Sequence, residues 1–319
     1  MKKLLSKTLI ATALALPALA YAAATPILFN PDGVAGGAPT VSVDLLDWTP
    51  GNALAVNGNP VSGFLAPGSF TQLLYQSNLG LASLGGVTQA AAGIGGAQNF
   101  TAVAGFREVV LSNLTGLNPT FGFADGQVRT ASNFFYVYAN QVGNNLLGTG
   151  FVGGTIALSG YVSSVTSSNY TGGGTAANPT INARLDNFGN NDHLNTGTLV
   201  GSGTSDIVIK IDFANAAYFP DLVAGTSLSF FNSSQVTPFA QADPSRCFSS
   251  NGTVGCNTPN NVGAVNGVRQ ANDILARNFQ FQADGNSSFQ RVPEPGSLAL
   301  LGLALGAAGF VRRRTAKKA

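Results

Sequence analysis

The amino-acid sequence predicts an all-β body, built as an antiparallel β-sandwich or a barrel, between an N-terminal signal helix and a short C-terminal transmembrane helix. Several runs alternate apolar and polar residues, as half-buried strands do. Glycine and asparagine separate these runs, and both tolerate the positive φ angles of tight hairpins. Each end of the chain also joins an apolar run to basic residues. Sandwich and barrel stay open as alternatives, because both are built from short antiparallel strands.

The clearest strand signal lies at 206–213, where Ile207, Ile209, Ile211 and Phe213 share one face and polar residues fill most of the other. This is the period of two that a strand with one buried face requires. Further candidate strands are 106–111, 128–140, 155–163, 226–231 and 277–283. Many short strands without a strict internal repeat favour a sandwich or barrel over a solenoid or propeller.

Turns are predicted where small residues interrupt these runs. The candidates are Asn57-Gly58, Asp125-Gly126, 172–174, Asn251-Gly252 and Asp284-Gly285. One segment, 71–84, has some helical character and ends at Gly85-Gly86. We therefore expect antiparallel strands joined by tight turns, with at most a little helix.

The body is unusually poor in charge. Charged residues make up 9% of the chain, against about 25% in ordinary soluble domains. Eight of the basic residues lie at the two ends, so acids outnumber bases in the body; these eight are Lys2, Lys3, Lys7, Arg312, Arg313, Arg314, Lys317 and Lys318. Nucleic-acid binding needs clustered Lys and Arg, and this pattern argues against it. Gly, Asn, Ser and Thr as polar groups suit a surface or matrix protein.

Residues 1–22 read as a signal peptide. A basic start precedes a short apolar run, Pro17 follows it, and Ala20-Tyr21-Ala22 supplies an A-x-A cleavage site. We expect the Sec machinery and signal peptidase as partners, with cleavage after Ala22. An uncleaved anchor is the alternative, although the apolar run is short for a bilayer span.

The C-terminal end has three parts: Pro293-Glu294-Pro295, an apolar run at 298–311, and the cluster Arg312-Arg313-Arg314. As a helix the run is roughly 21 Å long, shorter than the ~30 Å hydrocarbon core. The positive-inside rule places the arginines in the cytoplasm and the body outside the inner membrane. Proline keeps the segment before the run extended, as a protease substrate must be. A buried core helix is the alternative.

These three parts, in this order, resemble the PEP-CTERM sorting signal of Gram-negative bacteria. The resemblance covers the tail alone. Together with the N-terminal leader, it divides the chain into a signal peptide (1–22), a secreted β body (23–291) and a sorting signal (292–319). It implies processing by an exosortase, a membrane transpeptidase-like protease, in a bacterium that makes exopolysaccharide. It also implies a precursor transiently tethered to the inner membrane, whose body ends at the cell surface or in the extracellular matrix.

A second resemblance rests on residues 44–55, which hold the only Trp, and on the segment Phe279–Phe289. With the tail, they are similar to the flocculation-associated PEP-CTERM proteins, secreted proteins that help exopolysaccharide-producing cells form flocs. Trp48, Tyr136 and Tyr138 are candidate platforms for stacking on a sugar ring. The alternative for Trp48 is an ordinary core aromatic.

The two cysteines, Cys247 and Cys256, are expected to form a disulfide, because the chain is exported. Such a bond would close a loop of about 10 residues and contribute roughly 2.5–3 kcal/mol. Free thiols are the alternative, and the spacing is not that of a zinc site.

We assign no catalytic or metal-binding residues from the sequence, and we expect no cofactor. His193 is the one histidine, and neither a G-x-S-x-G elbow nor an H-E-x-x-H motif is present. Asp and Asn at 186–192 could offer oxygen ligands to Ca²⁺, but turn chemistry accounts for them equally well.

Three functions remain for comparison. The first is a non-enzymatic matrix protein that promotes floc or biofilm formation with exopolysaccharide. The second is a carbohydrate-binding module with a defined aromatic groove around 134–138. The third is a hydrolase acting on the matrix, for which no pair of carboxylates can be nominated from the sequence.

Overall fold

The computed structural model describes residues 25–58, 65–145, 148–175, 181–182, 198–199, 201–235 and 279–290. In these residues the prediction of an all-β body is confirmed: they form β-strands and a single 3-10 helix, η2 (Ala90–Ala92). Of the two architectures left open, the sandwich is wrong and the barrel is correct. The signal helix and the transmembrane helix were predicted for residues that lie outside this set.

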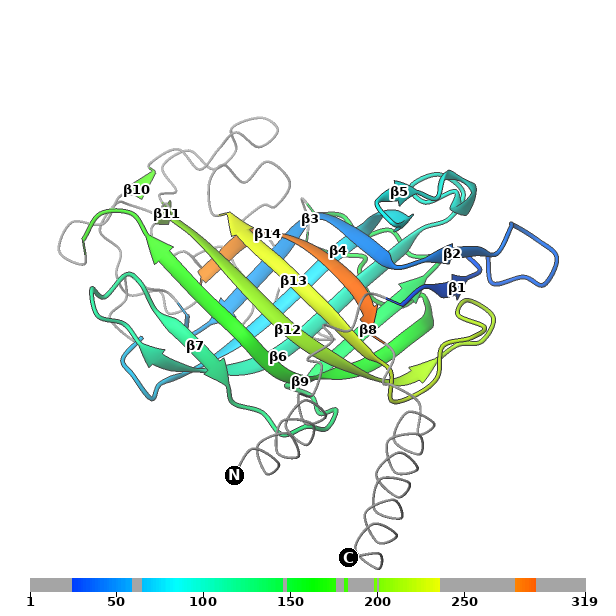
Figure 1. Ribbon diagram of the computed structural model, residues 1–319. Helices are drawn as coiled ribbons and strands as arrows, with labels where there is room; N and C mark the ends of the chain where they lie inside the picture. The colour runs from blue at the N-terminus through cyan, green and yellow to red at the C-terminus, as the bar shows by residue number, and fades with distance from the viewer. Residues whose placement is uncertain are drawn as a thin grey trace, which may run out of the picture.

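Eight strands close into an antiparallel barrel (Figure 1). In chain order they are β3 (Leu45–Val56), β4 (Phe70–Leu84), β6 (Phe100–Ser112), β8 (Phe134–Ala139), β9 (Thr155–Gly172), β12 (Gly201–Ala214), β13 (Ser227–Gln235) and β14 (Phe279–Gln290). Each strand pairs with the next in this order, and β14 pairs with β3 to close the ring. This up-and-down order leaves the ring of strands without a free edge.

Short strand pairs lie at the two ends of the barrel. At one end, β1 (Ile27–Phe29) pairs with β2 (Val41–Val43). At the opposite end lies the pair β10 (Ile181–Asn182) and β11 (Thr198–Leu199) (Figure 1). Two further strands, β5 (Val87–Thr88) and β7 (Thr120–Phe123), extend the main sheet beside β4 and β6.

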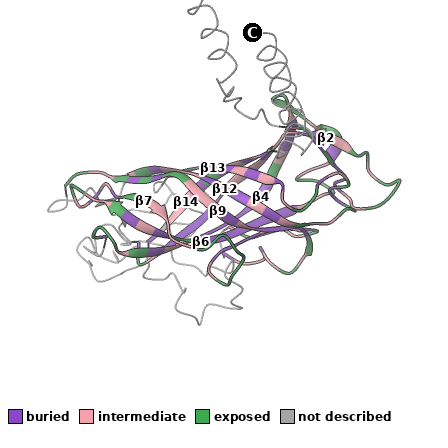
Figure 2. Ribbon diagram, turned by 60° about the horizontal axis from the view of Figure 1, so that its bottom comes forward, coloured by how far each residue is buried: buried purple, intermediate pink, exposed green. Residues whose placement is uncertain are grey.

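The core fills the barrel interior because alternate residues of each strand point inward. On β8, Phe135 and Val137 belong to this core, while Phe134, Tyr136 and Tyr138 face outward. Figure 2 shows the buried residues concentrated along the strands and the exposed ones mainly in the connections. At the end that carries β1, Phe29 stacks on Phe219 with ring centroids 5.1 Å apart, and both are fully buried. Aromatic side chains therefore seal this end.

The helical interpretation of 71–84 is wrong, because the segment lies in β4. Both faces of β4 are covered: Tyr75 faces the interior, and Leu74 packs outside the barrel against Phe151. Because buried apolar residues lie on both faces, this segment lacks the alternation of apolar and polar residues that identifies a strand with one buried face. Gly85 and Gly86 both have positive φ, 56° and 79°, and form the two-residue turn to β5.

The strand at 206–213 is confirmed within β12, but the inward position of Phe213 is wrong. Its side chain is 46% exposed, whereas Ile207, Ile209 and Ile211 are buried. The pairing of β12 with β9 shifts register between Ile211 and Phe213, and such an irregularity changes which face a following side chain takes.

Two other predicted boundaries differ in the structure. The strand expected over 128–140 begins only at Phe134, because Thr130 Oγ1 accepts hydrogen bonds from the backbone N–H groups of Ser132 and Asn133 and holds a turn there. The turn predicted at Asp284-Gly285 is a register shift inside β14. Glycine is needed there because a Cβ atom at Gly285 would lie 2.7 Å from the Phe230 ring.

Candidate functional site

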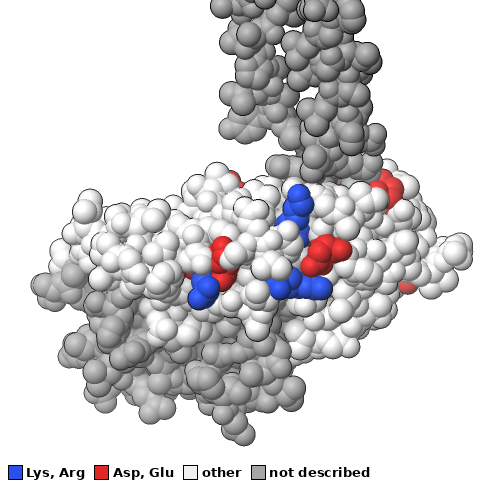
Figure 3. All heavy atoms as spheres, turned by 90° about the horizontal axis from the view of Figure 1, so that it is seen from below, with Lys and Arg blue, Asp and Glu red and all other residues white. Residues whose placement is uncertain are grey.

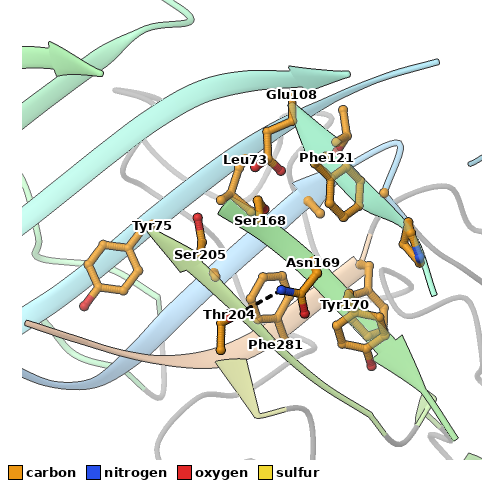
Figure 4. A pocket seen from close by; sticks show the side chains of 16 residues that line it. Leu73, Tyr75, Glu108, Phe121, Ser168, Asn169, Tyr170, Thr204, Ser205 and Phe281 are labelled. Carbon is orange, nitrogen blue, oxygen red and sulfur yellow. Dashed lines mark hydrogen bonds between the residues drawn. The ribbon is translucent and has the colours of Figure 1, made fainter. Parts of the chain in front are cut away.

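A pocket opens inside the barrel toward the end opposite β1 (Figure 4). It contains about 610 Å³ of space between atoms, its open mouth included. The walls come from β3, β4, β6, β7, β9, β12 and β14, and they are mostly apolar. Aromatic rings dominate one side: Tyr170 and Phe279 meet edge to face at 5.4 Å, and Phe279 and Phe281 lie 5.7 Å apart.

Glu108 is the one acidic residue among the described residues that line this pocket. It reaches the interior because it continues the inward face of β6, after Ala104 and Phe106. Its side chain is 3% exposed, and Figure 4 shows it turned toward Leu73 and Ser168. A charged side chain this deeply buried is rare unless it is paired.

The environment of Glu108 favours its neutral form. Burial raises the pKa of its carboxyl from 4.5 to about 7, and a hydrogen bond with the Ser168 side chain offsets part of this rise. Glu108 Oε1 has no hydrogen-bond partner within the described part of the chain. The site therefore holds a carboxyl oxygen that is desolvated and still able to accept a hydrogen bond.

Three more polar atoms of residues that line the pocket are buried without a partner among the described residues: Tyr75 Oη, Tyr170 Oη and Ser205 Oγ. Burial also raises the pKa of Tyr170 above its ordinary value, so this phenol stays protonated and able to donate. Buried polar atoms are normally satisfied by protein or water. Four unsatisfied ones on residues around a single pocket point to a site for another molecule.

Glu108 was not among the predicted site residues, although the sequence contains a usable signal for it. Phe100, Ala102, Ala104 and Phe106 mark the buried face of β6 in steps of two. The next step falls on Glu108, so the alternation itself places an acid in the interior. Only the predicted strand 106–111 was recognised, and it was too short to reveal this pattern.

Trp48 does not serve as an exposed sugar platform, so that candidate role is corrected here. Its side chain is 1% exposed and lies in the barrel core, where Nε1 donates a hydrogen bond to Ser287 Oγ at 3.0 Å. The strand β3 turns the indole inward, and an indole buried on both faces cannot stack on a polysaccharide. The alternative, a core aromatic, is the one that the structure supports.

Tyr136 and Tyr138 lie together on the outer face of β8. Both are half-buried, and their rings stack with centroids 5.8 Å apart and planes at 23°. The Arg129 guanidinium lies over the Tyr136 ring at 5.5 Å and also contacts Asp212 at 3.2 Å. The structure thus brings the two tyrosines together, on the opposite side of the sheet from Trp48.

Charged groups are sparse on the described surface, and the face in Figure 3 is mostly uncharged with a few small mixed groups. Arg107 pairs with Asp125 at 2.7 Å, in addition to the pair between Arg129 and Asp212. No helix within the described ranges has the length and apolar character needed to cross a membrane.

Several predicted site residues lie outside the described residues. They are the sorting-signal residues Pro293, Glu294, Pro295, Arg312, Arg313 and Arg314, the cysteines Cys247 and Cys256, and His193 with the turn at 186–192. The disulfide and the cleavage after Ala22 stay predictions.

The fold and the pocket define the body as a closed antiparallel barrel with an internal cavity. The particular kind of protein follows from the tail: the PEP-CTERM protein-sorting motif matches residues 291–314, and the chain is therefore an exported protein targeted to exosortase, with a membrane-anchored precursor stage. This confirms the sorting signal predicted from the sequence. Searches of curated proteins and of solved structures found no significant match to the chain.

Proposed function

We propose that the mature barrel is a non-enzymatic protein of the cell surface or extracellular matrix that promotes floc or biofilm formation together with exopolysaccharide. The sorting motif at 291–314 carries this proposal, because it directs the body out of the cell. The low charge of the chain is in keeping with it, since neutral Asn, Ser, Thr and Gly groups hydrogen-bond readily to sugars. A hydrolase of glycosidic bonds would use two carboxyls, and the described pocket residues supply one.

The test is a deletion of the gene in the bacterium that makes the protein. We expect polysaccharide secretion to continue while the cell aggregates disperse, and the intact gene to restore them. A gene lacking the codons for 291–314 should fail to restore aggregation, because its product is not sorted. Aggregation that persists unchanged in the deletion strain would overturn the proposal.

A second candidate is a carbohydrate-binding site on the outer face of β8, favoured by the stacked pair Tyr136 and Tyr138. Adjacent aromatic rings provide a platform for the apolar faces of sugars. The test compares retention on purified polysaccharide for the variants Tyr136→Ala and Tyr138→Ala. Phe70→Ala, which removes an exposed aromatic on β4, is the matched control. Equal retention by all three variants and the parent protein would dismiss this site.

A further inference from the structure

The barrel interior is not filled uniformly. Near β1 the core is closed by stacked aromatic rings, whereas the other end contains the pocket around Glu108. Small residues, Ala53 and Ala55 among them, line this space in place of larger apolar side chains that would fill it. The cavity is therefore a built feature of this end of the barrel.

The lining combines an apolar surface with a few polar groups, and Glu108 supplies the one carboxyl among them in the described residues. Phe121, Phe279 and Phe281 offer ring surface to a hydrocarbon body, while Glu108 Oε1 lacks a partner among the described residues. A buried acceptor without a donor costs free energy, and that cost disappears when a bound molecule supplies an N–H or O–H group. Sites for small molecules commonly have this composition, with many apolar contacts and a few placed polar groups.

We propose that this pocket binds a small, mainly apolar molecule that carries one hydrogen-bond donor, and that Glu108 Oε1 accepts the hydrogen bond. The apolar body lies against the phenylalanine side of the pocket. A primary aliphatic alcohol and a primary aliphatic amine share this chemistry. The proposal is independent of the matrix function, because it concerns the interior of the barrel and not its outer face.

The protonation state of Glu108 makes the binding of an amine and of an alcohol depend differently on pH. Tyr75 and Tyr170 are the other titratable side chains among the described lining residues, and the pKa of each is raised, so both stay neutral near pH 7. A protonated amine gains from the ionised carboxylate and binds more tightly as the pH rises through about 7. An alcohol needs no charge on Glu108 and depends less on pH.

The experiment uses the protein recovered from the cells that export it, titrated calorimetrically with octan-1-ol, octylamine and 1-methoxyheptane. The last compound is an isomer of octan-1-ol that has the same apolar size and no donor. We expect the alcohol or the amine to bind about fivefold more tightly than the ether, the factor that one hydrogen bond of ordinary net strength supplies. Equal binding of all three compounds, or binding of none, would overturn the proposal.

Two variants locate the site. Glu108→Met replaces the carboxyl with an apolar side chain of similar length and should remove the preference for the donor while the ether still binds. Ser205→Phe should fill the pocket from β12 and weaken all three compounds. A preference that survives in Glu108→Met, or unchanged affinity in Ser205→Phe, would refute the assignment. The comparison of the three compounds on the parent protein needs no variant. It therefore tests the proposed binding even where a variant fails to fold.

Discussion

Trp48 Nε1 donates a hydrogen bond to Ser287 Oγ across 3.0 Å, and both residues are buried. Trp48 belongs to β3, the first strand of the barrel, and Ser287 to β14, the last. The bond therefore joins two residues far apart in sequence at the seam where the barrel closes. Ser287 Oγ also donates a hydrogen bond to the Leu46 carbonyl oxygen at 3.4 Å, so a second hydrogen bond joins β14 to β3 at this seam.

Removing the Ser287 hydroxyl should weaken this seam. Ser287→Ala leaves the indole N–H buried without an acceptor, so we expect the free energy of unfolding to fall by about 1–3 kcal/mol. Denaturant unfolding measures this change. The neighbouring Ser288→Ala lies on the outer face of β14 and should stay within about 0.5 kcal/mol of the parent. If both variants are equally stable, the hydrogen bond contributes nothing.

Substitutions of Trp48 and Tyr136 should have different effects, the first on folding stability and the second on sugar binding. Trp48→Ala removes a fully buried side chain and should cost about 3–5 kcal/mol of folding free energy, while the folded fraction retains its affinity for polysaccharide. Tyr136→Ala should cost far less stability, because its ring is half-buried, and should lower polysaccharide retention if the outer face binds sugar. Unfolding curves and retention assays on the same samples distinguish the two effects. Loss of retention in folded Trp48→Ala would contradict the core role of this residue.

Glu108 should make stability depend on pH. Its pKa is about 7 in the folded protein and near 4.5 in the unfolded chain, so the folded state holds the proton more tightly. The resulting stability is fully present below pH 4.5 and is lost as the pH rises through about 7. The gap corresponds to roughly 3 kcal/mol.

Glu108→Gln should abolish most of this loss and be more stable than the parent above pH 7. The measurement is the free energy of unfolding between pH 4 and pH 8. Desolvation also raises the pKa values of Asp47 and Asp284, so Asp47→Asn is the control that removes a smaller part of the same trend. A parent protein whose stability does not fall between pH 4.5 and pH 7.5 would show that the Glu108 carboxyl is not buried as described.

Gly160 is needed for strand packing. A Cβ atom there would overlap the backbone carbonyl oxygen of Lys210 on β12, which cannot move without separating the two strands. We expect Gly160→Ala to lower the free energy of unfolding by about 2–3 kcal/mol. At Gly126 the nearest atom to a new Cβ would be 3.8 Å away, so Gly126→Ala is the matched control and should be nearly neutral. Equal effects of both substitutions would contradict the close approach of β9 and β12.

The strands that sequence reasoning found are those with one apolar face, as in β12, because burial of that face is local to the strand. Prediction from local patterns failed where tertiary contacts determine which face a side chain takes. Leu74 on the outer face of β4 is buried because it packs with Phe151, and Phe213 turns outward because of a register shift with β9. Closure of the barrel also depends on the pairing of β3 with β14, which no local pattern encodes. The sorting motif needed no such contacts and was recognised in full.

The sorting tail should be required for release of the body from the membrane. Replacing Pro293, Glu294 and Pro295 with alanine removes both prolines from the matched motif at 291–314, and alanine, unlike proline, permits a helix that would not fit a protease cleft. We expect the variant to accumulate as a membrane-bound precursor, which intact-mass measurement of the membrane and secreted fractions detects. The control replaces Lys317 and Lys318, which lie beyond the matched residues, and should be processed normally. Normal release of the Pro293–Pro295 variant would mean that the cut depends on the arginine cluster alone, and the same measurement on Arg312→Ala, Arg313→Ala, Arg314→Ala would then show retention.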